Sequence, residues 1–149
     1  MLSNKFKFNY SIGAVANGVK TDTFTFFLLF FYSNIIGLNP GLAGSAIFIA
    51  LCIDAVTDPL MGTISDRTNS SLGRRHPYML ISFIPMSLGY IFLFAPRQDW
   101  DMSQTDLFIW MTIFTVLTRV GMTLFDIPHR AFGGEVTKDY QERTILMSW

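Results

Sequence analysis

Four long apolar segments constrain this chain more than any other feature of its sequence. They cover about residues 10–36, 41–64, 78–95 and 107–132, and each is long enough to cross a bilayer, which takes roughly 20 mostly apolar residues. Because the membrane core offers no water to the backbone, such segments must be helical. We therefore expect an all-α membrane protein with four transmembrane helices, and residues 144–149 have the composition expected at the start of a fifth.

Composition supports a membrane protein and excludes several other classes. Half of the 149 residues are hydrophobic, 15% are charged and the formal net charge is zero, whereas a soluble domain is usually nearer a quarter charged. No basic excess favours a nucleic-acid partner, and the single cysteine, Cys52, allows no internal disulfide. With one cysteine and two separated histidines, we expect no zinc-type metal site and no cofactor.

The connections between the spans predict their orientation. Lys and Arg are concentrated before the first span, between the second and third, and after the fourth, while the other two connections hold only Arg97. Positive residues favour the cytoplasmic side of a membrane. We therefore expect the N-terminus, Asn69 and Lys138 in the cytoplasm, and Asn39 and Asp101 on the outer side.

Proline and small residues predict local features of the helices. Pro85 lies within the third span, where it should leave the carbonyl of Ile81 unpaired and bend the helix, and Pro96 should end that span. Small residues gather at the start of the second span and are expected to permit close helix packing: Gly41, Gly44, Ser45 and Ala46.

Two aspartates lie within the second span, where charge is costly. Asp54 and Asp58 are four residues apart and share one helix face, and each carboxylate costs roughly 3 kcal/mol at membrane depth on insertion scales. A bound cation or a proton would relieve this cost and their mutual repulsion. Thr57 supplies a hydroxyl and Pro59 frees a backbone carbonyl, and such oxygens suit hard cations. The alternative is that both aspartates lie near the cytoplasmic end, hydrated or salt-bridged.

The fourth span carries a second polar group. Thr123, Asp126 and Arg130 recur at three- and four-residue intervals, which places them on roughly one helix face, and the same span contains Arg119. One interpretation is a face that lines a solute cavity. The other is that His129 and Arg130 mark the interfacial end of the helix, with Asp126 as their partner.

The first span also contains polar residues at membrane depth, namely Asn17, Lys20 and Asp22. Lys20 and Asp22 are two positions apart, so they point to nearly opposite sides of a helix and cannot pair with each other. Lys20 could instead form an ion pair with an aspartate of the second or fourth span.

Short motifs around these residues resemble a known family. The run Gly62-xxx-Asp66-Arg67, followed by Gly73-Arg74-Arg75, resembles the cytoplasmic loop signature of the major facilitator superfamily. More narrowly, residues 31–38 (FYSNIIGL), 54–62 (DAVTDPLMG) and 126–128 (DIP) resemble the glycoside–pentoside–hexuronide:cation symporters. The resemblance covers nearly the whole chain.

This resemblance implies twelve helices in two six-helix halves, which move a solute by alternating access. The chain would then be part of the N-terminal half of a multi-pass protein in a bacterial cytoplasmic membrane, with the remaining helices missing. In such symporters the carboxylates matched by Asp54 and Asp58 bind the coupling Na⁺ or H⁺, helped by the positions matched by Thr57 and Thr123. The aspartate matched by Asp126 binds sugar hydroxyls.

The expected function is therefore cation-coupled symport of a sugar, glycoside or related small solute, without enzymatic activity and without activity of the fragment alone. The candidates for solute binding are Asp126, Arg130, Asn17, Lys20 and Asp22. Two positions depart from well-known members of the family. Gly18 stands where a second sugar-binding aspartate is expected, and Arg130 replaces a sugar-stacking aromatic residue, which admits an anionic solute.

Two other functions are compatible with parts of the sequence. Asp-x-x-x-Asp near a helix end also occurs in membrane prenyltransferases, where it holds Mg²⁺ and a diphosphate. That chemistry requires a second acidic cluster on a facing helix, and Asp126 is the only acid of the fourth span's polar face. The other possibility is an inactive, truncated membrane protein.

Overall fold

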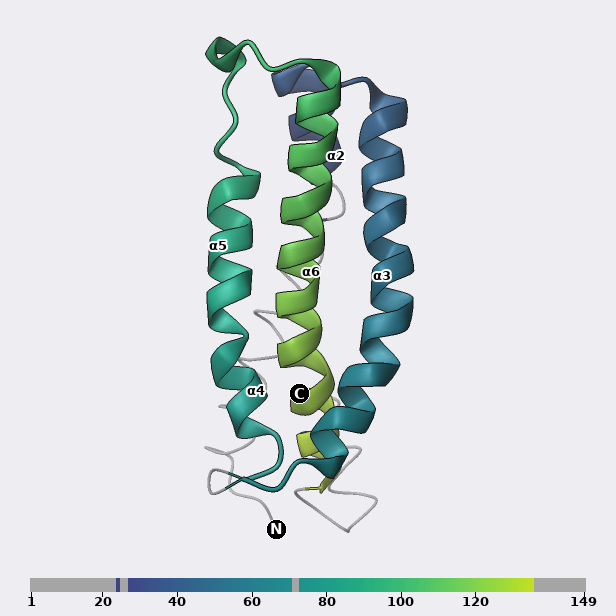
Figure 1. Ribbon diagram of the computed structural model, residues 1–149, viewed down its shortest axis with the longest axis vertical. Coiled ribbons are helices and arrows are strands. Elements are labelled where there is room, and N and C mark those ends of the chain that lie inside the picture. Colours follow the sequence, from purple (N-terminus) through teal and green to yellow (C-terminus); the bar gives the residue numbers. More distant parts are fainter. Residues whose placement is uncertain (1–23, 25–26, 71–72, 136–149) are drawn as a thin grey trace.

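The computed structural model shows a bundle of long helices that run side by side (Figure 1). It describes Phe24, residues 27–70 and residues 73–135. Three helical segments in this part of the chain are long and apolar enough to cross a membrane, namely Pro40–Arg67, His76–Leu93 and Gln104–Ala131. They match the second, third and fourth predicted spans, as expected for a multi-pass membrane protein. Most of the first predicted span and the start of the fifth lie outside the described residues.

The first predicted span ends in a short helical segment that is followed by a tight turn. The short helix α2 (Leu28–Phe30) continues into the π-helix η2 (Phe31–Ile36), which ends at Gly37 with a left-handed φ of 87°. Asn39 then caps helix α3 (Pro40–Arg67), because its side chain accepts a hydrogen bond of 2.8 Å from the backbone N–H of Gly41. Pro40 is tolerated at the first helical position, where its missing N–H has no partner to lose.

The third predicted span consists of two helices, α4 (His76–Ile81) and α5 (Phe83–Leu93), which meet at Ser82. This break lies where Pro85 was expected to bend the span, because proline offers no N–H to the carbonyl four residues before it. Helix α5 ends before Pro96. The single-turn helix η3 (Gln98–Trp100) follows, and then the long helix α6 (Gln104–Glu135). The predicted ends of the spans differ from the observed ones by up to three residues.

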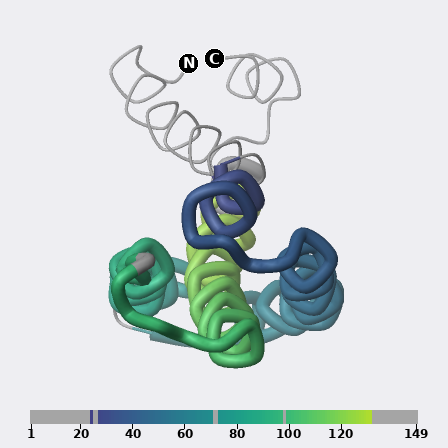
Figure 2. The backbone as a smooth tube through the Cα atoms, turned by 90° about the horizontal axis from the view of Figure 1, so that it is seen from above, coloured from purple at the N-terminus to yellow at the C-terminus, as the bar shows by residue number. Residues whose placement is uncertain are grey.

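Helix α6 is the centre of the bundle. Figure 1 shows it between α5 and α3, and the view from above in Figure 2 places the α2–η2 segment on a further side. Both α3 and α6 begin at the same end of the bundle and run in the same direction. Residues one turn apart on α3 can therefore meet residues one turn apart on α6.

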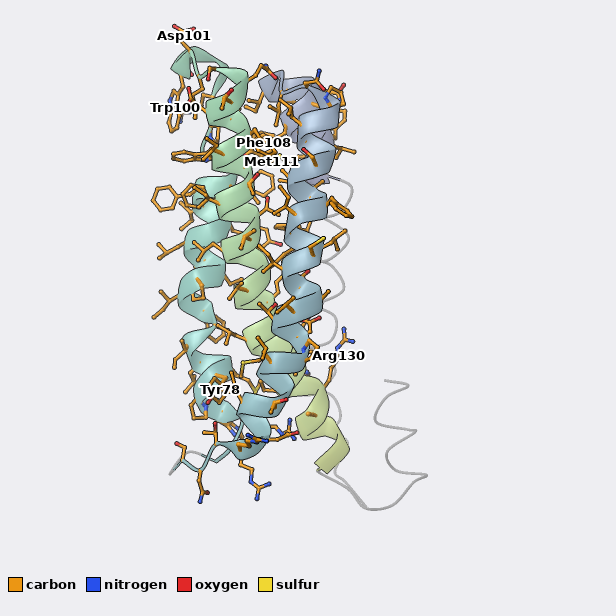
Figure 3. The ribbon with its side chains drawn as sticks, turned by 45° about the vertical axis from the view of Figure 1, so that its right-hand side comes forward. Tyr78, Trp100, Asp101, Phe108, Met111 and Arg130 are labelled. Carbon is orange, nitrogen blue, oxygen red and sulfur yellow. The ribbon has the colours of Figure 1, made fainter. Side chains whose placement is uncertain are left out.

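The core lies in the half of the bundle where α6 begins (Figure 3). Its buried members come from every long helix: Phe24, Leu28, Tyr32, Leu38, Ala43, Ala46, Leu93, Leu107 and Met111. Hydrogen bonds of Tyr32 and Gln104 join the elements at this end. The hydroxyl of Tyr32 donates to the last-turn carbonyl of Leu93 at 2.7 Å. The side chain of Gln104 donates to the carbonyl of Gly37 at 2.9 Å and accepts from the N–H of Asn39 at 2.8 Å.

Close helix packing occurs at glycines that the sequence did not single out. A Cβ on Gly121 of α6 would lie 2.7 Å from the backbone nitrogen of Met86, and one on Gly89 of α5 would lie 2.2 Å from the Thr118 hydroxyl. In contrast, Gly44 has nothing within 4 Å of its Cβ position. Of the small residues expected to pack closely at the start of the second span, Ala46 is buried, whereas Gly44 meets no neighbour among the described residues. The small residues of α3 that pack inward are alanines 43, 46 and 50, because they lie on the face turned to the core.

Candidate functional site

Two side-chain contacts join α3 to α6 near the middle of the bundle. Arg119 donates to Oδ2 of Asp54, and the hydroxyl of Thr123 donates to Oδ1 of Asp58 at 2.7 Å. In each pair the partners are 65 positions apart in sequence. Because the two helices are parallel and both steps are four residues, one helical turn of α3 matches one turn of α6. The two aspartates therefore meet two different partners on a single facing helix.

The pair of Asp54 and Arg119 is largely shielded from solvent. Their side chains are 19% and 17% exposed, and the guanidinium lies over the ring of Phe24 at 5.5 Å from its centroid. Only one oxygen of the carboxylate is used. Within the described residues, Oδ1 of Asp54 and Nε of Arg119 are buried and make no hydrogen bond. An unpaired buried carboxylate oxygen is costly unless a ligand, ion or water satisfies it.

A cavity of about 220 Å³ opens at these contacts. Its lining combines the polar residues of α3 and α6 with three apolar side chains: Phe24, Asp54, Asp58, Arg119, Met122, Thr123, Asp126, Ile127 and Arg130. Among the described residues, the lining contains three carboxylates (Asp54, Asp58 and Asp126) and two guanidiniums (Arg119 and Arg130), which sum to one net negative charge when all are ionised. Arg130 lies towards the end of the bundle opposite Asp101, as Figure 3 shows.

The donor atoms of the described lining are of the type that hard cations prefer. Carboxylate, hydroxyl and backbone carbonyl oxygens are the ligands that such cations prefer, and the free Oδ1 of Asp54 and the net charge leave a single positive charge to be supplied. Among the residues that the structure describes, no group of three or more His, Cys, Asp or Glu side chains is placed to hold a metal ion. A cation here would thus depend on a mixed set of oxygens.

The structure brings together most of the residues singled out in the second and fourth spans. Asp54, Asp58, Thr123, Asp126 and Arg130 all line the cavity. The interpretation that Thr123, Asp126 and Arg130 share one helix face is confirmed by their common place in the lining.

Other candidates lie elsewhere. Thr57 is not part of the lining, and its hydroxyl donates to the backbone carbonyl of Asp54 at 3.5 Å. Thr57 directly precedes Asp58 in the chain, so the two side chains lie on different sides of the helix. Asn17, Lys20 and Asp22 lie outside the described residues, so their place in the site stays a prediction.

The contact that sequence reasoning missed is that of Arg119 with Asp54. A signal was present, because Arg119 and Thr123 repeat the four-residue spacing of Asp54 and Asp58. That spacing acquires meaning only when the two helices are known to be parallel and in this register. Phe24 was not anticipated at all, since an apolar residue in a span carries no functional signal of its own.

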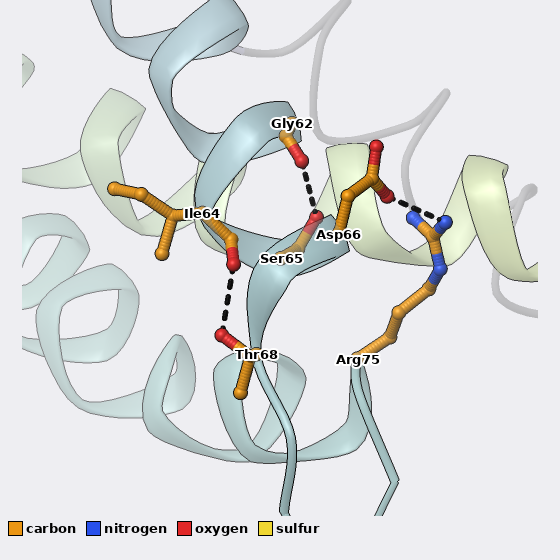
Figure 4. Close-up of polar contacts among 6 residues, drawn as sticks. All are labelled: Gly62, Ile64, Ser65, Asp66, Thr68 and Arg75. Carbon is orange, nitrogen blue, oxygen red and sulfur yellow. Dashed lines mark hydrogen bonds and ion pairs between the residues drawn. The ribbon is translucent and has the colours of Figure 1, made fainter.

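The loop motif after α3 forms a separate cluster at the far end of the bundle (Figure 4). Arg75 is 7% exposed and donates to the carboxylate of Asp66 at 2.8 Å. Gly73 adopts a φ of 91°, which an L side chain would strain, and Gly62 approaches Ile127 of α6. Arg67 and Arg74 are exposed. Of the predicted loop residues, Asp66 and Arg75 thus connect the end of α3 to the start of α4.

Comparisons with known proteins agree on one family. Residues 9–149 match the family model described as MFS/sugar transport protein. The inner membrane symporter YicJ of Escherichia coli (strain K12) is 32% identical over 149 residues, which is 100% of this chain and 32% of that protein. The putative glycoside/cation symporter YagG of the same organism is 32% identical over 148 residues, 99% of this chain and 32% of its own length.

A third protein, from another organism, is similar to the same extent. The uncharacterized symporter sll1374 of Synechocystis sp. is 35% identical over 146 residues, which cover 96% of this chain and 27% of that protein. The chain thus spans about a third of the length of these relatives.

Proposed function

This chain belongs to the MFS/sugar transport protein family, the glycoside–pentoside–hexuronide symporters of the major facilitator superfamily, and we propose that the full-length protein carries a glycoside or related sugar together with a monovalent cation. The site is the cavity between α3 and α6. We place the protein in a bacterial cytoplasmic membrane, in keeping with its bacterial relatives. The N-terminus faces the cytoplasm in this proposal, as the distribution of Lys and Arg favours.

The observation that carries this proposal is the composition of the cavity lining. Asp54 and Asp58 reach the cavity from α3, and Thr123 and Asp126 reach it from α6, so cation ligands and hydroxyl-binding groups share one space. A cation bound near Asp58 lowers the negative charge that a solute meets, and a bound solute closes the cavity over the cation. Each ligand then raises the affinity of the other by the same factor, as linkage requires.

The solute side of the cavity has its own chemistry. Asp126 offers a carboxylate, which accepts hydrogen bonds from sugar hydroxyls about twice as strongly as a neutral acceptor. Arg130 adds a donor with a permanent charge at the same rim. A hydroxyl-rich solute satisfies the first group, and a carboxylate on that solute would satisfy the second. The printed name of YagG, a putative glycoside/cation symporter, is in line with a glycoside.

Transport requires helices beyond these residues. The relatives are about three times as long as the match, and among the described residues the lining comes from α3, α6 and Phe24. Large side chains also remain exposed on the outer faces of α3 and α5, among them Phe48 and Ile84. We propose that residues 1–149 alone do not transport, because a cavity without its second wall cannot alternate between the two sides of the membrane.

The prenyltransferase alternative receives no support. The named relatives are symporters, which are transporters and not enzymes. Within the part of the chain that the structure describes, α6 contributes a single acid to the cavity, Asp126. Asp101 lies at the opposite end of the bundle from Arg130, so the acids near the start of α6 cannot complete a diphosphate site (Figure 3).

The test is uptake by the full-length protein reconstituted in liposomes. A panel of radiolabelled glycosides and uronides is offered under an imposed Na⁺ gradient, a proton gradient, or neither. We expect one solute class to accumulate only with an ion gradient, and Asp58→Asn to abolish that accumulation. Asp99→Asn is the matched control, since it removes the same charge from an exposed turn outside the cavity. Uptake that does not depend on either gradient would contradict cation coupling.

A further inference from the structure

One carboxylate of the candidate cation site already holds a cation that belongs to the protein. Arg119 donates from Nη1 to Oδ2 of Asp54, and both side chains are mostly buried. A guanidinium cannot be deprotonated in a protein, so this positive charge is permanent. The face of the Phe24 ring adds a second favourable contact at 5.5 Å. The guanidinium is therefore held from two sides, next to the carboxylate that a metal cation would need.

The carboxylate of Asp58, one helical turn further along α3, has a neutral hydrogen-bond partner instead of a charged one. Asp58 receives only a neutral hydroxyl donor, Thr123, at 2.7 Å, and within the described residues this is its one hydrogen bond. The other charged groups that line the same cavity are Asp126 and Arg130. Helix α6 thus presents a charged partner to one aspartate and a neutral partner to the next, one turn further along. Without Arg119, both carboxylates would be open to an external cation.

We propose that Arg119 is a specificity-determining residue that acts as a tethered cation at Asp54 and keeps Na⁺ from binding tightly there. This rests on the proposed function, in which the cavity takes a coupling cation. The physical reason is twofold. A Na⁺ ion at Asp54 would be repelled by a guanidinium a few ångströms away in a partly buried setting. It would also have to displace the hydrogen bond from Arg119, which leaves a buried guanidinium without its partner.

The geometry predicts what removing the charge would do. Arg119 uses one oxygen of Asp54, and Oδ1 is buried without a partner in the described residues. A neutral side chain of similar size would therefore leave the carboxylate of Asp54, which lines the cavity together with Asp58 and Thr123, without a cationic partner. Carboxylate and hydroxyl oxygens of this kind form a site for a hard cation. Arg119→Gln is the substitution that removes charge while keeping a hydrogen-bond donor.

The experiment measures binding of Na⁺ alone to the purified full-length protein in detergent, by calorimetry at constant pH with choline chloride holding the ionic strength. We expect Arg119→Gln to bind Na⁺ about a hundredfold more tightly than the wild type, because one like charge is removed from the site. Arg119→Lys keeps the charge and should remain weak. Arg130→Gln is the matched control in the same cavity, and it should change Na⁺ affinity far less, since Arg130 is not the partner of Asp54.

A double-mutant cycle links the effect to Asp54. Asp54→Asn in the Arg119→Gln background should remove most of the gained affinity, because the carboxylate that was released is then absent. Equal Na⁺ affinity of the wild type and Arg119→Gln would overturn the inference, as would an Arg119→Lys variant that gains as much as Arg119→Gln. If Arg119→Gln does not elute as a single species in size-exclusion chromatography, the Na⁺ affinity of the wild type is the test. A wild-type Kd for Na⁺ under about 1 mM would overturn the proposal.

The outcome is separate from that of the proposed function, because Na⁺ binding needs no solute. If Arg119→Gln gains Na⁺ affinity but no glycoside or uronide is taken up under any gradient, the transport proposal fails and the role of Arg119 stands. If uptake is ion-driven and Arg119→Gln gains nothing, the role of Arg119 fails and the transport proposal stands.

Discussion

The hydroxyl of Thr123 donates a hydrogen bond of 2.7 Å to the carboxylate of Asp58 across the contact between α6 and α3. Thr123 is 7% exposed, so this donor is largely shielded from solvent. The bond orients one oxygen of Asp58 and leaves the rest of the carboxylate to the cavity. A threonine at this position therefore orients the aspartate, and in the proposed cation site its own oxygen would be a further ligand.

Replacing Thr123 tests that arrangement in the full-length protein. Thr123→Val keeps the shape but removes the hydroxyl, and hydrogen bonds to charged groups contribute about 1.5–3 kcal/mol. We expect the concentration of coupling cation that gives half-maximal uptake to rise at least about tenfold, since about 1.4 kcal/mol corresponds to a factor of ten. Thr123→Ser restores the hydroxyl and should behave nearly as the wild type. A valine variant with unchanged cation dependence would mean that the bond is structural only.

Asp126 is expected to act on the solute more than on the cation. It lines the cavity but has neither the Arg119 nor the Thr123 contact that distinguishes the α3 aspartates. Asp126→Asn should weaken solute binding about tenfold, because a neutral acceptor makes bonds about half as strong as a charged one. Binding of cation and of solute to the purified variant is measured separately. Lost cation binding with unchanged solute affinity would move Asp126 into the cation site.

Arg130 is expected to distinguish neutral from acidic solutes. Its guanidinium lies in the cavity lining and pairs well with a carboxylate. Arg130→Ala should therefore reduce uptake of a uronide strongly and leave uptake of a neutral glycoside within about twofold of the wild type, because only a charged partner gains from the guanidinium. Competition between the two solutes on one preparation measures the ratio. An equal loss for both would assign Arg130 to packing.

The topology predicted from positive residues is testable at three connections. Asn39 lies at the same end of the bundle as the start of α6, since its N–H donates to Gln104 at 2.8 Å, while the connection that contains Asn69 lies at the other end. In a Cys52→Ala background, an impermeant maleimide added outside should label cysteines at positions 39 and 101 and leave one at 69 unlabelled. Labelling at position 69 alone would show that the predicted orientation in the membrane is inverted.

The crossing of α5 and α6 should be the most sensitive packing contact. A methyl group at Gly121 would lie 2.7 Å from the nitrogen and 3.0 Å from the Cα of Met86, so the helix backbones must move apart. We expect Gly121→Ala to destabilise the full-length protein by about 1–3 kcal/mol. Gly44→Ala is the control, because among the described residues nothing lies within 4 Å of its added methyl group. Thermal unfolding in detergent should separate the two, and equal midpoints would contradict the crossing.

Much of this architecture follows from the sequence by itself. Apolar runs of membrane length must be helical, since each backbone polar group needs a partner inside its own segment, and the helices α3 and α6 lie where those runs predicted them. Asp54 and Asp58 share a helix face because a helix repeats every 3.6 residues, and this requires no tertiary information. The break near Pro85 and the cap at Asn39 also follow from local chemistry.

Only the tertiary structure decided which residues meet across helices. Three contacts join residues far apart in the chain: the ion pair of Arg119 with Asp54, the hydrogen bond from Gln104 to the carbonyl of Gly37, and the close approach of Gly121 to Met86. Each depends on how a helix is rotated about its axis and how far it slides along its neighbour. In a membrane an apolar surface is compatible with lipid on every side, so hydrophobic pattern does not determine that rotation or register. Specific polar contacts and close packing of small residues determine it instead.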